Sequence, residues 1–294
     1  MIIYDYFSTA PAAFSIACGV LGLLIGSFLN VVIYRLPIMM ERDWKQQCEE
    51  FLADDEEASS PNNNQQERFD LTLPRSRCAS CNHPIAARDN IPVLSYLILA
   101  GKCRHCKSRV SFRYPFVELL TAAASVAVAM HFGFGVQAFF ALILTWSLIA
   151  LTFIDYDTQL LPDDITLPLL WLGLIISIES VFVDSSTSII GAAAGYLSLW
   201  LVYQLFRLVT GKEGMGFGDF KLLALLGAWL GWQMLPLVIL LSSVVGAIIG
   251  LSLVLFKKHN KDHPIPFGPY LAIAGWVALM YGEVIVDQYL TLTF

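Results

Sequence analysis

Two aspartates at the ends of apolar segments are the residues of this sequence best suited to acid–base chemistry. Asp219 follows Gly214, Gly216 and Gly218 and stands where an apolar run begins. Asp155 closes a separate apolar run far upstream. A carboxylate in a membrane segment is costly, which makes both residues functional candidates. Taken alone, the glycine stretch equally fits a loop whose aspartate caps the next helix.

Paired carboxylates could hydrolyse a peptide bond. Where the dielectric constant is low, two neighbouring carboxylates cannot both ionise readily, so one keeps a proton near neutral pH. The ionised carboxylate can then take a proton from water, while the protonated one donates a hydrogen bond to the substrate carbonyl. No Ser–His–acid or Cys–His arrangement with suitable spacing is evident, and no His-Glu-x-x-His motif occurs. The sequence therefore favours an aspartate dyad.

Other acidic residues stand near the same segments. Asp157 follows the first candidate by two residues and is its rival. Asp163 or Asp164 is predicted to cap the next helix, with catalysis as the alternative. Glu118 lies in the first turn of a segment that starts at Pro115, where an acid suits the positive end of the helix dipole. A functional role for this glutamate is the alternative, because acids within membranes are commonly functional.

Four of the six cysteines form two close pairs that could bind a metal. The pairs are Cys78 with Cys81 and Cys103 with Cys106. Such knuckles fit a tetrahedral zinc site that stabilises a domain too small for much core. Disulfides and thioredoxin-like redox chemistry are disfavoured by the reducing cytoplasmic side, assigned below, and by the lack of a βαβ pattern. His83 or His105 could replace one thiolate, whereas Cys18 and Cys48 show no pairing pattern.

The composition is that of an integral membrane protein that binds no nucleic acid. Of 294 residues, 56% are hydrophobic and 14% charged, and the mean hydropathy is +0.64. The net charge is −6, and no basic stripe alternates with aromatic residues, as it would in a nucleic-acid-binding surface. The first apolar stretch lacks a basic flank and is long enough to span a bilayer, so we expect a retained helix and no cleaved signal peptide.

Eight apolar segments predict an all-α polytopic fold of about eight transmembrane helices. They cover approximately 11–34, 115–132, 136–154, 166–183, 187–209, 220–235, 237–256 and 269–290. Gly231 and Pro236 interrupt the sixth. Several segments carry glycines four residues apart, which predicts close helix packing, and Asn30 is expected to hydrogen-bond between helices.

The positive charges orient these segments. All 18 Lys and Arg residues lie between Arg35 and Arg113, at Arg207, Lys212 and Lys221, or between Lys257 and Lys261. With eight spans these clusters occupy alternate loops on one side, which the positive-inside rule makes cytoplasmic. Both termini are then periplasmic, and Asp155 and Asp219 share one depth at the cytoplasmic face.

This topology divides the chain into three parts. Residues 1–34 form the first transmembrane helix, and residues 115–294 form a seven-helix domain that carries both aspartates. Between them, residues 35–114 form a small cytoplasmic domain between the first and second helices. Its first half, with Asp54, Asp55, Glu56 and Glu57, is expected to be a flexible solvated insertion. Its second half holds the four-cysteine zinc site.

These motifs together closely resemble the bacterial type IV prepilin peptidases, which are bifunctional leader peptidases and N-methyltransferases of the membrane aspartyl protease class. The matching stretches are Gly26-Ser27-Phe28-Leu29-Asn30-Val31-Val32-Ile33, Arg35-Leu36-Pro37, both knuckles, Asp155 with Leu161-Pro162-Asp163, Gly216-Phe217-Gly218-Asp219-Phe220-Lys221 and Pro266-Phe267-Gly268-Pro269. They extend over nearly the whole chain. The resemblance implies that Asp155 and Asp219 are the catalytic pair and that the four cysteines bind zinc. Tyr156-Asp157 also looks like the motif of presenilin-type proteases, but the family match favours Asp155.

The resemblance implies the substrates as well. Prepilins and type II secretion pseudopilins would lose a short basic leader after glycine at the bacterial inner membrane, and the new amino terminus, usually phenylalanine, would be methylated from S-adenosylmethionine. No glycine-rich cofactor fingerprint occurs, so the methyl donor would need an unusual pocket, for example around Asn30, Gly101 and Lys102. Two alternatives stay open: a peptidase of this class that does not methylate, and a non-enzymatic transporter whose acids relay protons. No inverted repeat is visible, which argues against the transporter.

Overall fold

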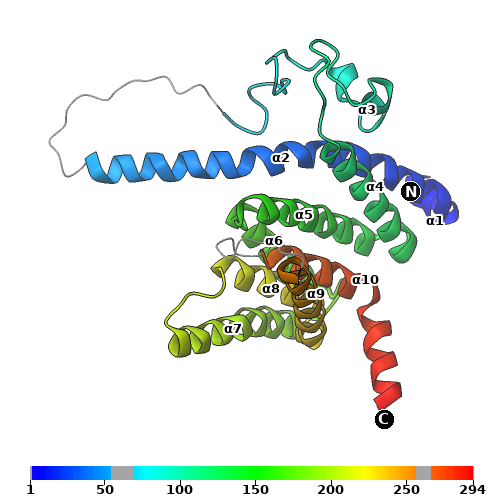
Figure 1. The fold of residues 1–294 in the computed structure, drawn as a ribbon. Coiled ribbons are helices and arrows are strands. Elements are labelled where there is room, and N and C mark those ends of the chain that lie inside the picture. The colour runs from blue at the N-terminus through cyan, green and yellow to red at the C-terminus, as the bar shows by residue number, and fades with distance from the viewer. Residues whose placement is uncertain (1, 54–68, 256–265, 294) are drawn as a thin grey trace. The chain divides into compact units, whose positions relative to one another are not determined.

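Helices make up all the regular secondary structure of the described chain (Figure 1). The computed structural model describes residues 2–53, 69–255 and 266–293. The α-helices are α1 (Ile2–Thr9), α2 (Pro11–Ala53), α3 (Leu94–Ile98), α4 (Arg113–Phe132), α5 (Val136–Thr158), α6 (Asp163–Ile176), α7 (Ser185–Thr210), α8 (Phe217–Leu230), α9 (Leu235–Leu255) and α10 (Gly268–Thr293). Three short 3₁₀ turns accompany them, at Ala87–Asn90, Ser177–Glu179 and Trp232–Met234. The predicted all-α class is confirmed.

Each of the eight predicted segments contains a helix, but the helices differ in length. Within the described residues, six are long and apolar enough to cross a membrane, namely α2, α4, α5, α7, α9 and α10. Helices α6 and α8 have 14 residues each, about 21 Å at 1.5 Å per residue, against a hydrocarbon core of about 30 Å. The sixth segment is shorter than predicted because α8 ends at Leu230, immediately before Gly231. The fourth ends at Ile176, where a 3₁₀ turn begins.

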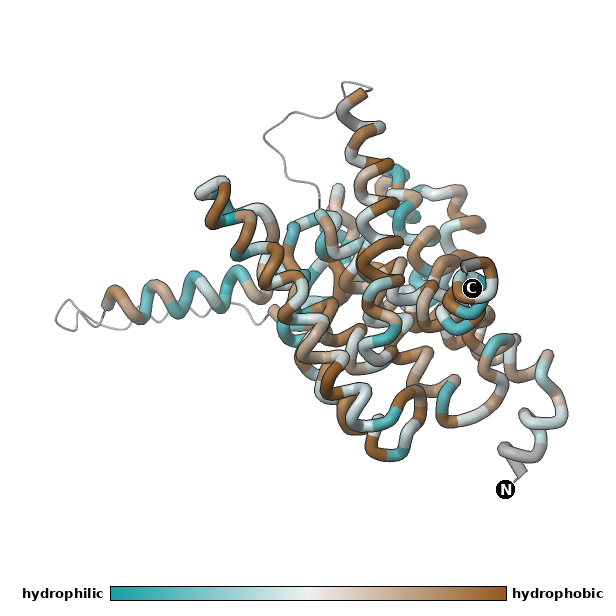
Figure 2. The backbone as a smooth tube through the Cα atoms, turned by 90° about the horizontal axis from the view of Figure 1, so that it is seen from below, coloured by the Kyte–Doolittle hydropathy of each residue, from teal (hydrophilic) through white to brown (hydrophobic). Residues whose placement is uncertain are grey.

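The chain divides into two compact units, Ala17–Ala124 and the remainder, and each is described by itself. In the first unit, α2 runs for 43 residues, about 65 Å, which is roughly twice the hydrocarbon thickness. Its sequence becomes more hydrophilic toward the end that precedes the first undescribed segment (Figure 2). The helix continues to Ala53, whereas we predicted that it would end at residue 34. The part beyond residue 34 is a hydrophilic continuation of the apolar helix. The acidic run 54–57, predicted to be flexible, lies outside the described residues.

Close packing and polar contacts join α2 and α4. A methyl group on Gly26 would lie 2.7 Å from the Cα atom of Glu118, so only glycine allows this approach. The Asn30 side-chain amide donates a hydrogen bond to the carbonyl of Tyr114 at 3.1 Å, which is the contact between helices that we expected. Arg35, which is buried, donates to the backbone carbonyls of Asp70 and Pro74. These contacts fix the start of the segment that carries the first cysteine pair.

Helix α8 lies at the centre of the second unit. All its residues from Asp219 to Leu230 are buried except Lys221, and α6, α7 and α10 contact it. Gly191 of α7 meets Gly227 of α8 so closely that a methyl group on Gly191 would lie 2.2 Å from the Gly227 carbonyl oxygen. Because protein surrounds α8, its short length leaves few backbone groups exposed to lipid.

Candidate active site and metal centre

Asp155 and Asp219 come to the ends of two helices of the same unit. Asp155 lies in the last turn of α5, which ends where Gln159 adopts a left-handed conformation and donates its N–H to the Asp155 carbonyl. Asp219 is the third residue of α8, whose N-cap is Gly216. Both aspartates are buried, with 5% and 8% of their surfaces exposed. The prediction that Asp219 begins a hydrophobic helix is therefore confirmed.

The two carboxylates interact electrostatically. The backbone of Gly268, at the start of α10, lies against the first of them: a methyl group there would lie 2.6 Å from Oδ2 of Asp155. Among the described residues, this buried oxygen makes no hydrogen bond of regular geometry, although the backbone N–H of Gly268 is a donor close to the carboxylate. A buried carboxylate oxygen without a regular hydrogen bond is unfavourable for folding alone. It is available to water or to a substrate.

Leu161 brings the three loop motifs into contact around these aspartates. A methyl group on Gly218 would lie 2.8 Å from Cβ of Leu161, and one on Gly268 would lie 3.2 Å from its Cδ1. The glycine-rich turn before α8, the turn before α6 and the start of α10 therefore meet at one place. Any larger residue at either glycine would push this leucine away.

Asp163 has a different role from the predicted helix cap. The N-cap of α6 is Pro162, and no side chain caps this helix. Asp163 instead accepts two hydrogen bonds from the Nζ atom of Lys221, at 2.8 and 2.7 Å. This ion pair joins the first turn of α6 to the first turn of α8, next to Asp219. Sequence reasoning missed it, although the lysine stands out as the one cation of α8.

Asp157 differs from Asp155 in its exposure. Its side chain lies on the exposed surface of the last turn of α5, and the neighbouring Tyr156 is 71% exposed. Asp164 in the first turn of α6 is also exposed. Among the acidic residues that the structure describes, only Asp155 and Asp219 combine burial with mutual proximity. Burial therefore favours Asp155 over its rival, although the assignment stays a prediction.

The four paired cysteines come together at one point. Their Sγ atoms all lie within 4.8 Å of one another, and Sγ of Cys78 is 3.8 Å from Sγ of Cys106. Thiolates about 2.3 Å from a tetrahedral zinc ion would be about 3.8 Å apart. Neither His83 nor His105 belongs to this cluster; their rings stack 4.4 Å apart beside it. The donor set is thus four sulfur atoms, which suits zinc.

The two knuckles have the same backbone geometry. The N–H of Cys78 donates to the carbonyl of His83 at 3.0 Å, and the N–H of Cys103 donates to that of Ser108 at 2.8 Å. Each turn places one residue, Asn82 or Lys107, in the left-handed region, at φ 54° and 60°. This repetition holds both pairs of thiols toward a common centre.

Glu118 is buried and fixes the loop between the two knuckles. Its Oε2 atom accepts the N–H of Val93 at 2.7 Å, and Arg104 of the second knuckle forms hydrogen bonds to both carboxylate oxygens of Asp89. Besides lying at the start of α4, Glu118 therefore holds the loop between the two knuckles through its hydrogen bond with Val93.

Two residues suggested for a methyl-donor pocket, Asn30 and Gly101, take part in packing. Asn30 bonds to α4, and Gly101 lies against the ring of Tyr96.

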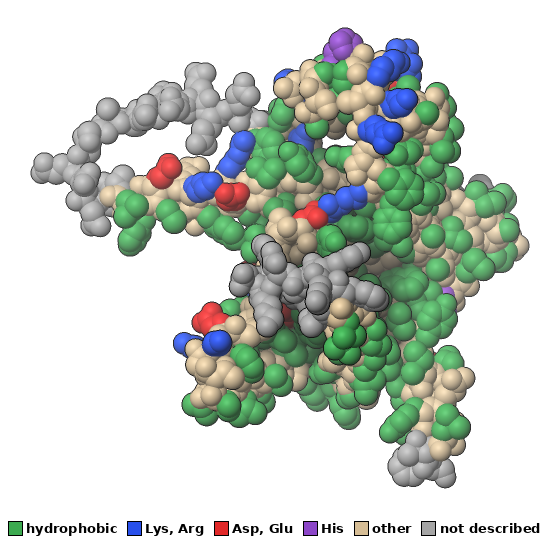
Figure 3. Space-filling model, in the orientation of Figure 1, with side chains coloured by type: hydrophobic (Ala, Val, Ile, Leu, Met, Phe, Trp, Pro, Cys, Tyr) green, Lys and Arg blue, Asp and Glu red, His purple; other side chains and the backbone are tan. Residues whose placement is uncertain are grey.

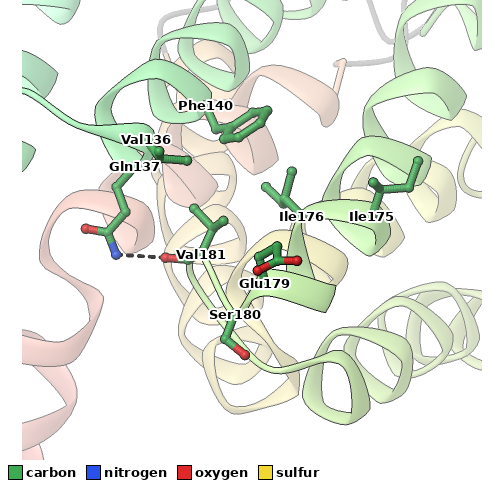
Figure 4. A pocket seen from close by; sticks show the side chains of 8 residues that line it. All are labelled: Val136, Gln137, Phe140, Ile175, Ile176, Glu179, Ser180 and Val181. Carbon is green, nitrogen blue, oxygen red and sulfur yellow. Dashed lines mark hydrogen bonds between the residues drawn. The ribbon is translucent and has the colours of Figure 1, made fainter. Parts of the chain in front are cut away.

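A pocket of about 630 Å³ lies beside the start of α5, and Figure 4 shows the side chains that line it. It is lined by Val136, Gln137, Phe140, Ile175, Ile176, Glu179, Ser180 and Val181. The Gln137 amide donates to the Val181 carbonyl at 2.7 Å. Val136 starts α5 and Asp155 lies in its last turn, about 28 Å away along the helix. Because it lies at the opposite end of α5 from Asp155, this pocket is not part of the aspartate site.

Comparison with known proteins assigns both halves of the chain. Residues 20–132 match the model of the bacterial peptidase A24 N-terminal domain, and residues 142–251 match that of the type IV leader peptidase family. The chain is 56% identical over 286 residues to a prepilin leader peptidase/N-methyltransferase of Stutzerimonas stutzeri, covering 97% of both chains. It is 54% identical to the protein of that name from Pseudomonas aeruginosa, over 99% of this chain and 98% of the relative. The Legionella pneumophila protein of the same name is 47% identical over 92% and 93%. No solved structure matches the chain.

Proposed function

Because the chain belongs to the type IV leader peptidase family, we propose that it removes the leader peptide of prepilins and methylates the new amino terminus. The substrates are prepilins and type II secretion pseudopilins, cut after the glycine that ends a basic leader. The observation that carries the peptidase assignment is the pair of buried, interacting carboxylates on α5 and α8. They lie beside three loop motifs that leave one carboxylate oxygen without a hydrogen bond of regular geometry within the described residues.

In this mechanism Asp155 and Asp219 share one proton. The ionised carboxylate removes a proton from the attacking water, and the protonated one donates a hydrogen bond to the scissile carbonyl. The proton then passes to the leaving amine as the tetrahedral intermediate collapses. Gly218 and Gly268 allow Leu161 and the carboxylate of Asp155 to approach the backbone closely, which holds the loops around the dyad in place.

Zinc is the metal that we propose for Cys78, Cys81, Cys103 and Cys106, in a structural role. Four thiolates fill a tetrahedral shell and leave no open position for substrate. The site would hold residues 69–112, hereafter the cysteine module, together. S-adenosylmethionine is the expected methyl donor, but we assign no residue to it and derive no step through it.

The proposed topology places the dyad on the cytoplasmic side of the bacterial inner membrane, with both termini periplasmic. Although α6 and α8 are short, each connects helices of spanning length. If either failed to cross, the Lys and Arg clusters would lie on both sides of the membrane, against the positive-inside rule. In this topology residues 35–114 lie on the cytoplasmic side, and the part of α2 from residue 35 to Ala53 belongs to this region.

One assay separates this proposal from its alternatives. Purified protein in lipid would be given a prepilin, and leader cleavage and methyl transfer would be measured separately. We expect both reactions. Cleavage without methylation would favour a peptidase alone, and neither reaction would favour the transporter.

A further inference from the structure

An apolar run of ten residues in the cysteine module has five exposed residues among those that the structure describes. Residues 91–100 read Ile-Pro-Val-Leu-Ser-Tyr-Leu-Ile-Leu-Ala. A run of this length is too short to span a bilayer and forms either a buried core helix or an interfacial segment. It is not a core here, because Leu94, Leu97 and Ile98 of α3 are 51%, 68% and 69% exposed. We therefore interpret residues 91–100 as a segment that lies at the membrane interface.

The exposed apolar surface continues from α3 onto a membrane helix of the same unit. Phe112 is exposed, and its ring centroid lies 6.4 Å from those of both Tyr96 and Phe116. Phe116 and Leu119 are exposed on α4, a helix of spanning length. These ring contacts connect α3, through Phe112, to exposed apolar side chains of a helix that is long and apolar enough to cross a membrane.

Hydrogen bonds hold α3 in this orientation. Its buried residue, Ser95, donates from Oγ to the carbonyl of Arg88 at 2.9 Å. The preceding residue, Val93, has a left-handed φ of 59° and donates its N–H to Glu118 of α4. The polar positions therefore face the module, and the leucines and isoleucine face outward.

The cysteine module that carries this surface is rich in cations. Within residues 69–113 there are eight Lys and Arg and two acidic residues. The backbones of Lys102 and Arg109 form an isolated antiparallel β-bridge, which lies after α3 in the chain, and both residues are exposed. Figure 3 shows Lys and Arg side chains beside hydrophobic ones in the part of the molecule that contains α3. Exposed apolar side chains with adjacent cations are typical of surfaces that bind anionic membranes.

We propose that α3 and Phe112 insert at the surface of the leaflet from which α4 emerges, with Lys102 and Arg109 against anionic phospholipid headgroups. The occupant of this face is lipid, because its apolar surface continues that of a spanning helix and its charge is opposite to that of the headgroups. This contact would hold the cysteine module against the membrane. It does not depend on the peptidase assignment.

Photocrosslinking in nanodiscs tests this directly. A photoreactive amino acid would replace Leu97 in the full-length protein, or Arg75 as the control, an exposed polar position of the same module. Discs would contain phosphatidylcholine with or without phosphatidylglycerol, and adducts would be identified by mass spectrometry. Zinc content would report correct folding of each variant. If the Leu97 variant lost zinc, Ile98 would be used.

We expect lipid adducts at position 97 and none at position 75. The adducts should be more abundant with phosphatidylglycerol and should fall at high salt, since the Debye length shrinks from about 10 Å at 0.1 M to about 3 Å at 1 M. Combining Lys102→Gln with Arg109→Gln should remove the preference for phosphatidylglycerol. Equal labelling of positions 97 and 75 would overturn the proposal. So would a prepilin that replaces lipid in the adducts at position 97, because the face would then bind substrate.

Discussion

At the scale of single residues, burial distinguishes groups that have the same chemistry. Asp155, Asp157 and Asp163 are all aspartates at helix ends, but only Asp155 is buried and lies near Asp219. The sequence identified both members of the pair because a carboxylate in an apolar segment is exceptional. It did not identify the partner of Asp163, because Lys221 is 58 residues away and only the fold brings them together.

The Asp163–Lys221 pair should contribute little to catalysis. Its two side chains are 49% and 30% exposed, and exposed pairs contribute about 0–1 kcal/mol. Asp163→Asn and Lys221→Met should therefore keep most of the leader-cleavage rate and lower the melting temperature only slightly. Steady-state cleavage and thermal unfolding would be measured in parallel. A loss of cleavage in Asp163→Asn as complete as in Asp219→Asn would show a direct catalytic role.

At the scale of elements, the sequence predicted where helices form better than how long they are. Each of the eight apolar segments contains a helix, but the short helices α1 and α3 were not predicted. Helix α2 extends to Ala53 as a charged helix that hydropathy could not reveal. Helix α8 ends at Leu230 because Gly231 adopts a positive φ of 81°, whereas its burial among α6, α7 and α10 is a tertiary property that hydropathy does not show. The two Cys-x-x-Cys pairs predicted the four-sulfur cluster correctly, because the spacing within each pair is a local feature of one turn.

The contact of α7 with α8 should be sensitive to a single methyl group. Gly191→Ala would place Cβ 2.2 Å from the Gly227 carbonyl oxygen, and we expect a loss of about 1–3 kcal/mol, as for overpacking in a core. Thermal unfolding in detergent would measure it. Gly135→Ala is the matched control, because nothing lies within 4 Å of its added methyl group and its φ is extended. Equal stability of the two variants would contradict this packing.

Removal of one thiolate should release the metal. Cys78→Ser and Cys106→Ser should each lower the zinc content and the amount of protein that accumulates, because metal binding contributes to folding of the module. Cys48→Ser, at an exposed cysteine outside the cluster, is the control. Zinc per chain would be determined on purified protein. Fully stable wild-type protein with well under one zinc per chain would refute the metal assignment.

At the scale of the whole molecule, charge determines the orientation that we propose. Single cysteines at Ser59 and Ser185, in a background that lacks Cys18 and Cys48 and keeps the four proposed zinc ligands, would report the side on which each lies. The background without an added cysteine is the control. An impermeant thiol reagent added to intact cells should label position 185 and not position 59. Labelling of position 59 from outside would show that the topology is the reverse of the one proposed. The dyad would then lie on the side of the membrane opposite to a cytoplasmic leader.

The measurement that tests the central claim most directly is leader cleavage by Asp155→Asn and Asp219→Asn, each purified and checked for zinc and thermal stability. An amide is nearly isosteric with the acid but cannot accept the proton from water, so each variant should lose cleavage while the fold survives. The double variant should be scarcely worse than either single one, because the two residues act as a unit. Asp157→Asn should remain active, and methylation of an already cleaved pilin should persist in both dyad variants. If Asp155→Asn cleaved normally and Asp157→Asn were inactive, Asp157 and not Asp155 would be the first catalytic aspartate. Normal cleavage by both Asp155→Asn and Asp219→Asn would contradict the aspartyl mechanism.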